Sequence, residues 1–159
     1  MDRTLLHAIA FSALPVLASC QADTAADTSA VEAIATESHC GPVQAGLEIL
    51  TSATAVDDAP SSVVRAGLEV VESGDSMLVV YLGQRPTSGY GAELEGARRD
   101  GGRLRLDLNA TEPHENAMTA QVITTPCVAL RIPSGDWSEI AVTMDAEGFP
   151  LELDRVDRR

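Results

Sequence analysis

Met77-Leu78-Val79-Val80-Tyr81-Leu82 is an unbroken run of apolar residues near the middle of the chain. A strand with one buried face alternates apolar and polar residues, whereas a run without alternation indicates a strand covered on both faces. Residues 83–89 are rich in glycine, proline and small polar residues, which predicts a turn. We therefore expect 77–82 to form a central strand and 90–94 to form the strand after the turn.

A second strong signal follows at Arg103-Leu104-Arg105-Leu106-Asp107-Leu108, where charged and apolar residues alternate strictly. This period of two places the three leucines on one face of a strand and the charges on the other. Asp100-Gly101-Gly102, immediately before it, is a strong turn signal. We expect a half-buried strand with its leucines in the core.

Other stretches also have the residue pattern of short strands: 47–51, 121–125, 128–132 and 140–144. Pro126 separates two of them and indicates an edge, a bulge or a kink, because proline cannot donate to a strand ladder. The segment 64–70 alternates as well, but the apolar residues of 63–72 also fit one face of a helix, so both interpretations stay open. The pattern predicts a mostly β protein, a small antiparallel β-sandwich or partly open barrel with few or no helices beyond a signal peptide.

The N-terminus has the pattern of a bacterial export signal. A short charged start precedes an apolar run from Ala8 to Leu17, which is too short to span a bilayer comfortably. The segment 17–20, Leu-Ala-Ser-Cys, resembles a lipobox, which implies cleavage after residue 19 and lipid attachment to Cys20. By analogy with Gram-negative lipoproteins, Gln21 favours the outer membrane, facing the periplasm or the exterior. An ordinary signal peptide followed by a chance cysteine is the alternative.

Composition divides the rest of the chain into a tether, a domain and a tail. Residues 20–38 are rich in alanine, threonine, aspartate and serine, which predicts a flexible tether. We expect a β-rich domain over 39–145 and a loosely held, charged tail over 146–159. The formal charge of −13 argues against binding to nucleic acids or to anionic lipid surfaces, both of which need basic patches.

With Cys20 assigned to lipid, Cys40 and Cys127 are left as an even pair. An oxidising compartment favours a disulfide between them, although spacing alone leaves two unpaired thiols as the alternative.

Catalytic and metal-binding motifs have little support in this sequence. His114 lies between Glu112 and Glu115, but a surface metal site needs more donors than these, so we expect no metal and no cofactor. A nucleophile pair of Cys127 and His114 is conceivable, and so is a hydrolase using acidic residues. Neither has positive support, and we predict that the protein is not an enzyme.

The loop between the first two expected strands is the most specific feature. Proline fixes φ, the two hydroxyl residues can bond the local backbone, and glycine allows positive φ. We predict a partner-binding loop formed by Arg85, Pro86, Thr87, Ser88, Gly89 and Tyr90. A purely structural hairpin with a buried Tyr90 explains the same residues.

Several motifs around this loop keep a fixed order: 82–90 (Leu-Gly-Gln-Arg-Pro-Thr-Ser-Gly-Tyr), 112–113 (Glu-Pro), 121–126 (Gln-Val-Ile-Thr-Thr-Pro) and 128–133 (Val-Ala-Leu-Arg-Ile-Pro). Together they resemble the C-terminal domain of the PrcB family, over residues 76–144. That family is named for a lipoprotein subunit of a surface protease complex. The resemblance implies a non-catalytic partner of a protease, and together with the lipobox it predicts a membrane-tethered binding or assembly module.

Residues 86–90 are also similar to the Pro-Thr-Thr-Gly-Tyr loop of chagasin-like cysteine-protease inhibitors, which have an immunoglobulin-like fold. This second resemblance implies an alternative function, protease inhibition through the 84–90 loop.

Overall fold

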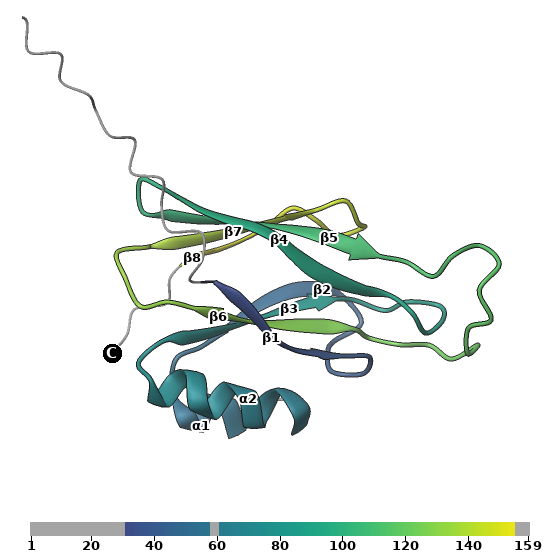
Figure 1. Cartoon of the computed structure of the whole chain (residues 1–159), viewed down its shortest axis with the longest axis horizontal. Helices are drawn as coiled ribbons and strands as arrows, with labels where there is room; N and C mark the ends of the chain where they lie inside the picture. Colours follow the sequence, from purple (N-terminus) through teal and green to yellow (C-terminus); the bar gives the residue numbers. More distant parts are fainter. Residues whose placement is uncertain (1–30, 58–60, 155–159) are drawn as a thin grey trace, which may run out of the picture.

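The computed structural model describes residues 31–57 and 61–154. Two four-stranded sheets face each other, and two helices cover the outer face of one of them (Figure 1). The strand orders are β1-β6-β3-β2 and β4-β5-β7-β8. The elements are β1 (Glu32–Glu37), β2 (Ala45–Leu50), α1 (Ala53–Asp57), α2 (Ser61–Glu72), β3 (Ser76–Leu82), β4 (Gly91–Asp100), β5 (Arg103–Thr111), β6 (Cys127–Ile132), β7 (Glu139–Met144) and β8 (Leu151–Asp154). The predicted small β-sandwich is confirmed.

The unbroken apolar run of β3 is explained by its position between two layers. Leu78, Val80 and Leu82 belong to the core between the sheets. Met77 and Val79 belong to a second core, between this sheet and the helices. Successive side chains of a strand point to opposite faces, so a strand buried on both sides needs apolar residues at every position. The prediction for 77–82 is confirmed.

Strand β5 shows the predicted alternation. Leu104, Leu106 and Leu108 are buried against the other sheet. On the outer face, Arg103 pairs with Glu139 of β7 at 2.5 Å. β5 and β7 run parallel, whereas every other pair among the named strands is antiparallel. The sequence predicts a purely antiparallel sandwich. The parallel pair of β5 and β7 departs from that prediction.

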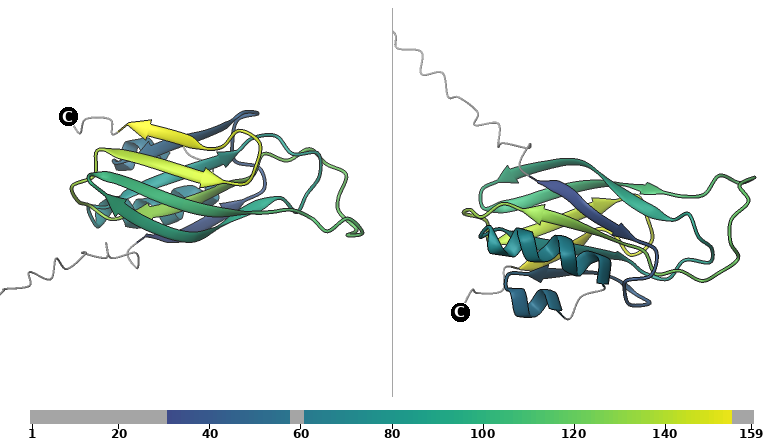
Figure 2. Two further views of the ribbon diagram at one scale, coloured as in Figure 1. Left: turned by 90° about the horizontal axis from the view of Figure 1, so that it is seen from above. Right: turned by 60° about the horizontal axis from the view of Figure 1, so that its bottom comes forward.

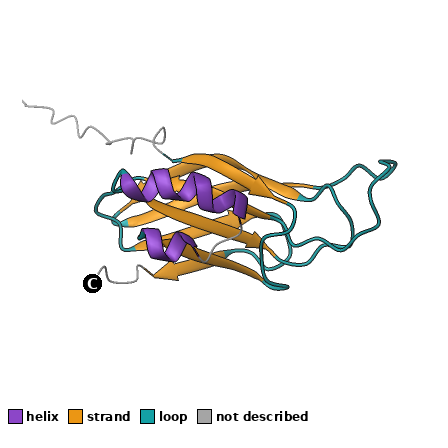
Figure 3. Ribbon diagram, turned by 90° about the horizontal axis from the view of Figure 1, so that it is seen from below, coloured by secondary structure: helices purple, strands orange, loops and turns teal. Residues whose placement is uncertain are grey.

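The helical interpretation of 63–72 is correct and the strand interpretation of 64–70 is wrong. Val63 and Val70 of α2 are buried against the outer face of β3, while Arg65 and Glu69 are exposed. Figure 3 shows both helices lying across this face of the sheet. The helix ends in a turn at Gly74, which adopts a φ of 89° and follows the pattern of helix C-termini. An apolar outer face on β3 requires such a cover.

Three further predictions are corrected by strand pairing. Residues 32–37 of the expected tether form β1, which pairs with β6, so the folded part begins before residue 39. Residues 151–154 of the expected loose tail form β8, which pairs with β7. Residues 121–125 are not a strand, although isolated bridges join Thr124 to Arg85 and Thr125 to His39.

The signal segment 1–19 and Cys20 lie outside the described residues. Within the described ranges, no helix has the length and apolar character needed to cross a bilayer.

Candidate functional site

Four connections lie together at one end of the sandwich: 38–44, 83–90, 112–126 and 145–150. The strand registers place them there, since Glu37 pairs with Cys127 and Gly91 pairs with Thr111. We call this the loop end. Two of the connections, 83–90 and 112–126, extend beyond the strands side by side in every view (Figures 1 and 2).

The predicted partner-binding loop is fixed to its neighbour by backbone hydrogen bonds. The N–H of Arg85 donates to the carbonyl of Thr124 at 2.8 Å, and the N–H of Thr124 donates back at 3.0 Å. The buried hydroxyl of Thr124 also donates to the carbonyl of Thr87 at 2.9 Å. Further out, the N–H of Ser88 donates to the carbonyl of Ala120 at 3.2 Å. The two loops therefore form one connected unit.

Two glycines permit this close packing. Gly83 has a φ of 77°, and a Cβ there would lie 2.9 Å from the backbone nitrogen of Ala45. Gly89 has a φ of 96° and packs against the ring of Pro113. Positive φ and contact this close both favour glycine over any residue with a side chain. The turn chemistry read from the sequence is what allows 83–90 to contact two other loops.

Tyr90 is half-buried. It is therefore neither a fully buried anchor in the core nor a fully exposed contact residue, which were the two predicted alternatives. The guanidinium of Arg85 lies 5.9 Å from the centre of its ring. This contact is within the range of a cation–π interaction and orients both side chains. Tyr90 also lines a shallow depression of about 280 Å³ with Glu37, Glu93 and Cys127.

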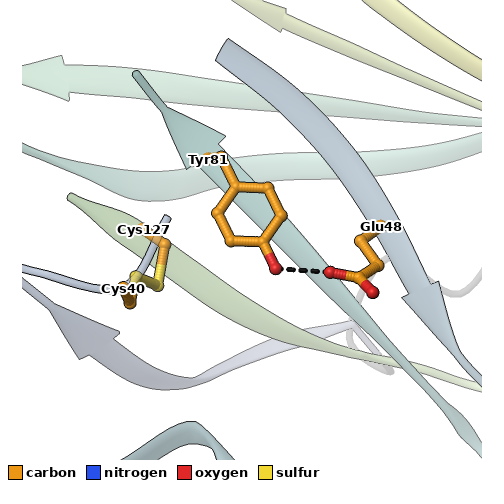
Figure 4. Close-up of a disulfide and its surroundings, with 4 residues drawn as sticks. All are labelled: Cys40, Glu48, Tyr81 and Cys127. Carbon is orange, nitrogen blue, oxygen red and sulfur yellow. Dashed lines mark hydrogen bonds between the residues drawn. A yellow bond between two sulfur atoms is a disulfide. The ribbon is translucent and has the colours of Figure 1, made fainter. Parts of the chain in front are cut away.

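Cys40 and Cys127 form a disulfide that ties the 38–44 connection to the start of β6 (Figure 4). This confirms the predicted pairing and leaves Cys127 unable to act as a nucleophile with His114. Tyr81 lies beside the bond, and its hydroxyl donates to the carboxylate of Glu48. Burial of the ring, and next the Glu48 carboxylate, raise the pKa of Tyr81 above its ordinary value.

The candidate metal-binding residues around His114 are not gathered into a set of ligands among the described residues. His114 is exposed, as are Glu112 and Glu115 on either side of it. Across residues 31–57 and 61–154, no three histidine, cysteine or acidic side chains are grouped closely enough to hold a metal ion.

The loop end also carries apolar side chains that the sequence reasoning did not select. Among the described residues, the large hydrophobic side chains that are exposed all lie on its connections: Val43 (65%), Met118 (104%), Val122 (45%) and Ile123 (59%). The sequence predicts a strand for 121–125, which would have covered part of these side chains. The sequence did contain one indication of their exposure. Val122 and Ile123 lie shortly before Pro126, and a proline cannot donate to a strand ladder.

The segment that contains the 83–90 and 112–126 connections matches a known protein family. The model described as PrcB C-terminal matches residues 76–133. Residues 76–133 are therefore similar to the PrcB C-terminal domain. The PrcB resemblance is thus confirmed, over a shorter range than the expected 76–144. No curated protein and no solved structure matches the chain significantly.

The PrcB segment runs from β3 to the residue after β6. It contains both connections that project together at the loop end, 83–90 and 112–126. It omits β1 and β2, which flank β6 and β3 in one sheet, and β7 and β8, which complete the other. The chagasin-like alternative stays a prediction. Its loop does not project alone here, because Ala120 and Thr124 are hydrogen-bonded to one side of it.

Proposed function

We propose that this protein is a non-catalytic, membrane-tethered binding module that serves as an accessory subunit of an envelope protease complex. The PrcB C-terminal match supports the link with a protease complex. The observation that carries the proposal is the concentration of exposed apolar side chains on the loop end. Exposed apolar clusters on soluble domains are typical of protein-binding surfaces.

The way in which the loops are held supports the same function. Ordering a flexible loop on binding costs conformational entropy, and a loop ordered beforehand avoids much of that cost. Bonds between Arg85 and Thr124 and between Ser88 and Ala120 order the 83–90 and 112–126 connections in the free protein. The disulfide at Cys40 does the same for 38–44. The apolar side chains are therefore presented on a preorganised surface.

The position of β1 suggests how the module would be oriented. Glu32 pairs with Arg131 at the far end of β6, so the chain enters the sandwich opposite the loop end. A lipid on Cys20 would attach only eleven residues before Val31, a maximum reach of about 40 Å. We propose that this anchor is embedded in the outer membrane and that the loop end faces away from it.

The binding proposal can be tested by placing a photo-cross-linking amino acid at Met118 in the full chain in cells. Met118 is fully exposed on the loop end, so we expect it to cross-link to a subunit of a protease complex. Arg65 is exposed on α2 and is the matched control. A protease product at Met118 and none at Arg65 would support the proposal, and equal or absent products at both positions would contradict it.

The anchor needs a separate test, since it concerns a different part of the chain. Cys20→Ser should move the protein from the membrane fraction to the soluble fraction, because several acyl chains on one cysteine hold a protein firmly. Ser38→Ala, at an exposed position that keeps the disulfide, is the control and should leave the protein in the membrane fraction. Retention of the Cys20→Ser protein in membranes would overturn this part of the proposal.

A further inference from the structure

A short segment of the loop end has an unused backbone edge. Residues 121–123 (Gln-Val-Ile) make no backbone hydrogen bond to any other part of the described chain. Their two ends are nevertheless fixed, since Ala120 bonds to Ser88 and Thr124 bonds to Arg85. All three side chains are exposed. The segment therefore combines a held backbone, free donors and acceptors, and two β-branched side chains, which are the residues favoured in strands.

The neighbouring residues show to which side the free backbone groups point. In an extended chain, N–H and C=O groups of successive residues point to opposite sides. Thr124 uses one side for Arg85, and Thr125 uses the other side for residues 38–40. There the N–H of Thr125 donates to Ser38 at 3.0 Å, and the N–H of Cys40 donates to Thr125 at 3.0 Å. By this alternation, the N–H and C=O groups of Ile123 and Gln121 point to the same side as those of Thr125. Residues 38–40 bond to Thr125 on that side and make no backbone bond to 121 or 123.

We infer that the partner of the loop end contributes an extended segment that pairs with Gln121 and Ile123 as an added strand. Such strand addition gives affinity through main-chain hydrogen bonds and specificity through alternate side chains. The side chains of Val122, Ile123 and Met118 would contact apolar residues of that segment. This inference rests on the proposed function, because it takes the loop end to be a protein-binding surface.

The charges at the loop end indicate the chemistry of the added segment. The four connections carry four carboxylates, Glu112, Glu115, Asp145 and Glu147, and one guanidinium, Arg85. Arg85 already lies against Tyr90. A segment flanked by lysine or arginine would thus be favoured. A second copy of this chain is disfavoured as the occupant, since each copy carries a formal charge of −13.

The test uses a defined probe, a nine-residue peptide of alternating threonine and valine with two lysines at each end. The peptide is titrated into residues 20–159 of the protein, in which Cys20→Ser prevents lipid attachment. Binding is followed through the amide NMR signals of the protein. We expect the amide signals of Gln121 and Ile123 to shift and their hydrogen exchange to slow. A peptide N-methylated at every threonine and valine has no free N–H on either edge and should not bind, and a glutamate-flanked peptide should bind at least about tenfold more weakly.

A matched pair of variants tests the backbone of the protein itself. Ile123→Pro removes the N–H and should weaken peptide binding by about tenfold or more, the effect of one lost hydrogen bond at a binding edge. Ile123→Val keeps both the N–H and the branched side chain, and should bind within about threefold of the native chain. Unfolding of each variant in urea shows whether the fold is retained.

The outcomes separate this inference from the proposed function. If the lysine-flanked peptide fails to bind, or if its N-methylated form binds equally well, strand addition is wrong. Cross-linking from Met118 to a protease subunit would then still support the proposed function. If the peptide binds as expected but Met118 gives no protease product, the edge is supported and the protease assignment is not.

Discussion

The two ends of the sandwich are built from similar connections but present different surfaces. At one end, which we call the turn end (73–75, 101–102 and 133–138), Asp75 accepts a hydrogen bond from Arg131 at 2.7 Å and one from the N–H of Ser134 at 2.9 Å. Trp137 is only 2% exposed there, and its indole N–H donates to the carbonyl of Pro133. These groups are paired and covered.

At the loop end, the backbone is held in place while apolar side chains are left uncovered. Met118 and Ile123 are exposed, and their loop is fixed by main-chain hydrogen bonds and by the hydroxyls of Thr124 and Ser88. Under the proposed function, the covered side chains of the turn end would serve folding stability, and the uncovered apolar side chains of the loop end would serve binding. Substitutions at each end can break or sharpen this comparison.

The disulfide is the loop end's own contribution to stability, and its removal should give the largest effect. The bond closes a loop of 87 residues, so the double substitution Cys40→Ser with Cys127→Ser should lower the free energy of unfolding by about 4–5 kcal/mol in the chain-entropy model. Urea unfolding followed by circular dichroism measures it. Chemical reduction of the native protein should give the same loss, and a loss below about 1 kcal/mol would mean that the bond contributes little.

Trp137→Ala should give the next largest effect. The substitution leaves a cavity in the core between the sheets and removes an indole hydrogen bond, at a cost of about 3–4 kcal/mol. Trp137→Phe should cost less, because it keeps a large ring. Urea unfolding measures stability, and cross-linking from Met118 measures binding. If Trp137→Ala abolished cross-linking while the protein stayed folded, the two ends would not be separable.

Asp75 should make turn-end stability depend on pH. The N–H of Ser134 and the guanidinium of Arg131 hold the pKa of Asp75 below its usual value of 3.8. A depressed folded pKa stabilises the protein above the unfolded pKa, and the effect is lost as pH falls from 3.8 through the folded pKa. Asp75→Asn should cost about 2 kcal/mol at neutral pH. The difference between native and variant, measured by urea unfolding, should shrink toward pH 2; a constant difference would contradict this.

The smallest effect on stability is expected from Val122→Ser with Ile123→Ser. Both side chains are exposed, so the free energy of unfolding should change by less than about 0.5 kcal/mol. Cross-linking from Met118 to the partner should nevertheless fall sharply. Val64→Ser with Val71→Ser, on half-buried positions of α2, is the control and should give the opposite result. Equal cross-linking by the loop-end variant would show that these side chains do not bind.

The sequence predicted the elements whose residues carry their own pattern. Residues 77–82 are buried on both faces and form an unbroken apolar run. Residues 103–108 are buried on one face and alternate between apolar and charged residues, so both strands could be predicted from residue order. β1 could not, because it is an edge strand with few apolar residues, and its pairing with β6 joins parts of the chain about ninety residues apart. β8 depends in the same way on β7.

The site was predicted in part. The conformation of 83–90 followed from its turn residues, and the disulfide from the even pair of cysteines. The strand predicted at 121–125 was wrong for a physical reason: its residues favour a strand, but most of that segment has no strand beside it in the described chain. The exposure of Val122 and Ile123 depends on that missing neighbour, which no local pattern shows.

The parallel pairing of β5 with β7 has a consequence for how the chain is made. Between these two strands the chain crosses to the other sheet and forms β6 there. When residues emerge N-terminus first, the edge of β5 that β7 will cover must therefore wait until 139–144 arrive. Uncovered strand edges promote aggregation, and charged residues oppose it. Arg103, Arg105 and Asp107 alternate with the leucines of β5, and they would protect the unfinished sheet during that delay.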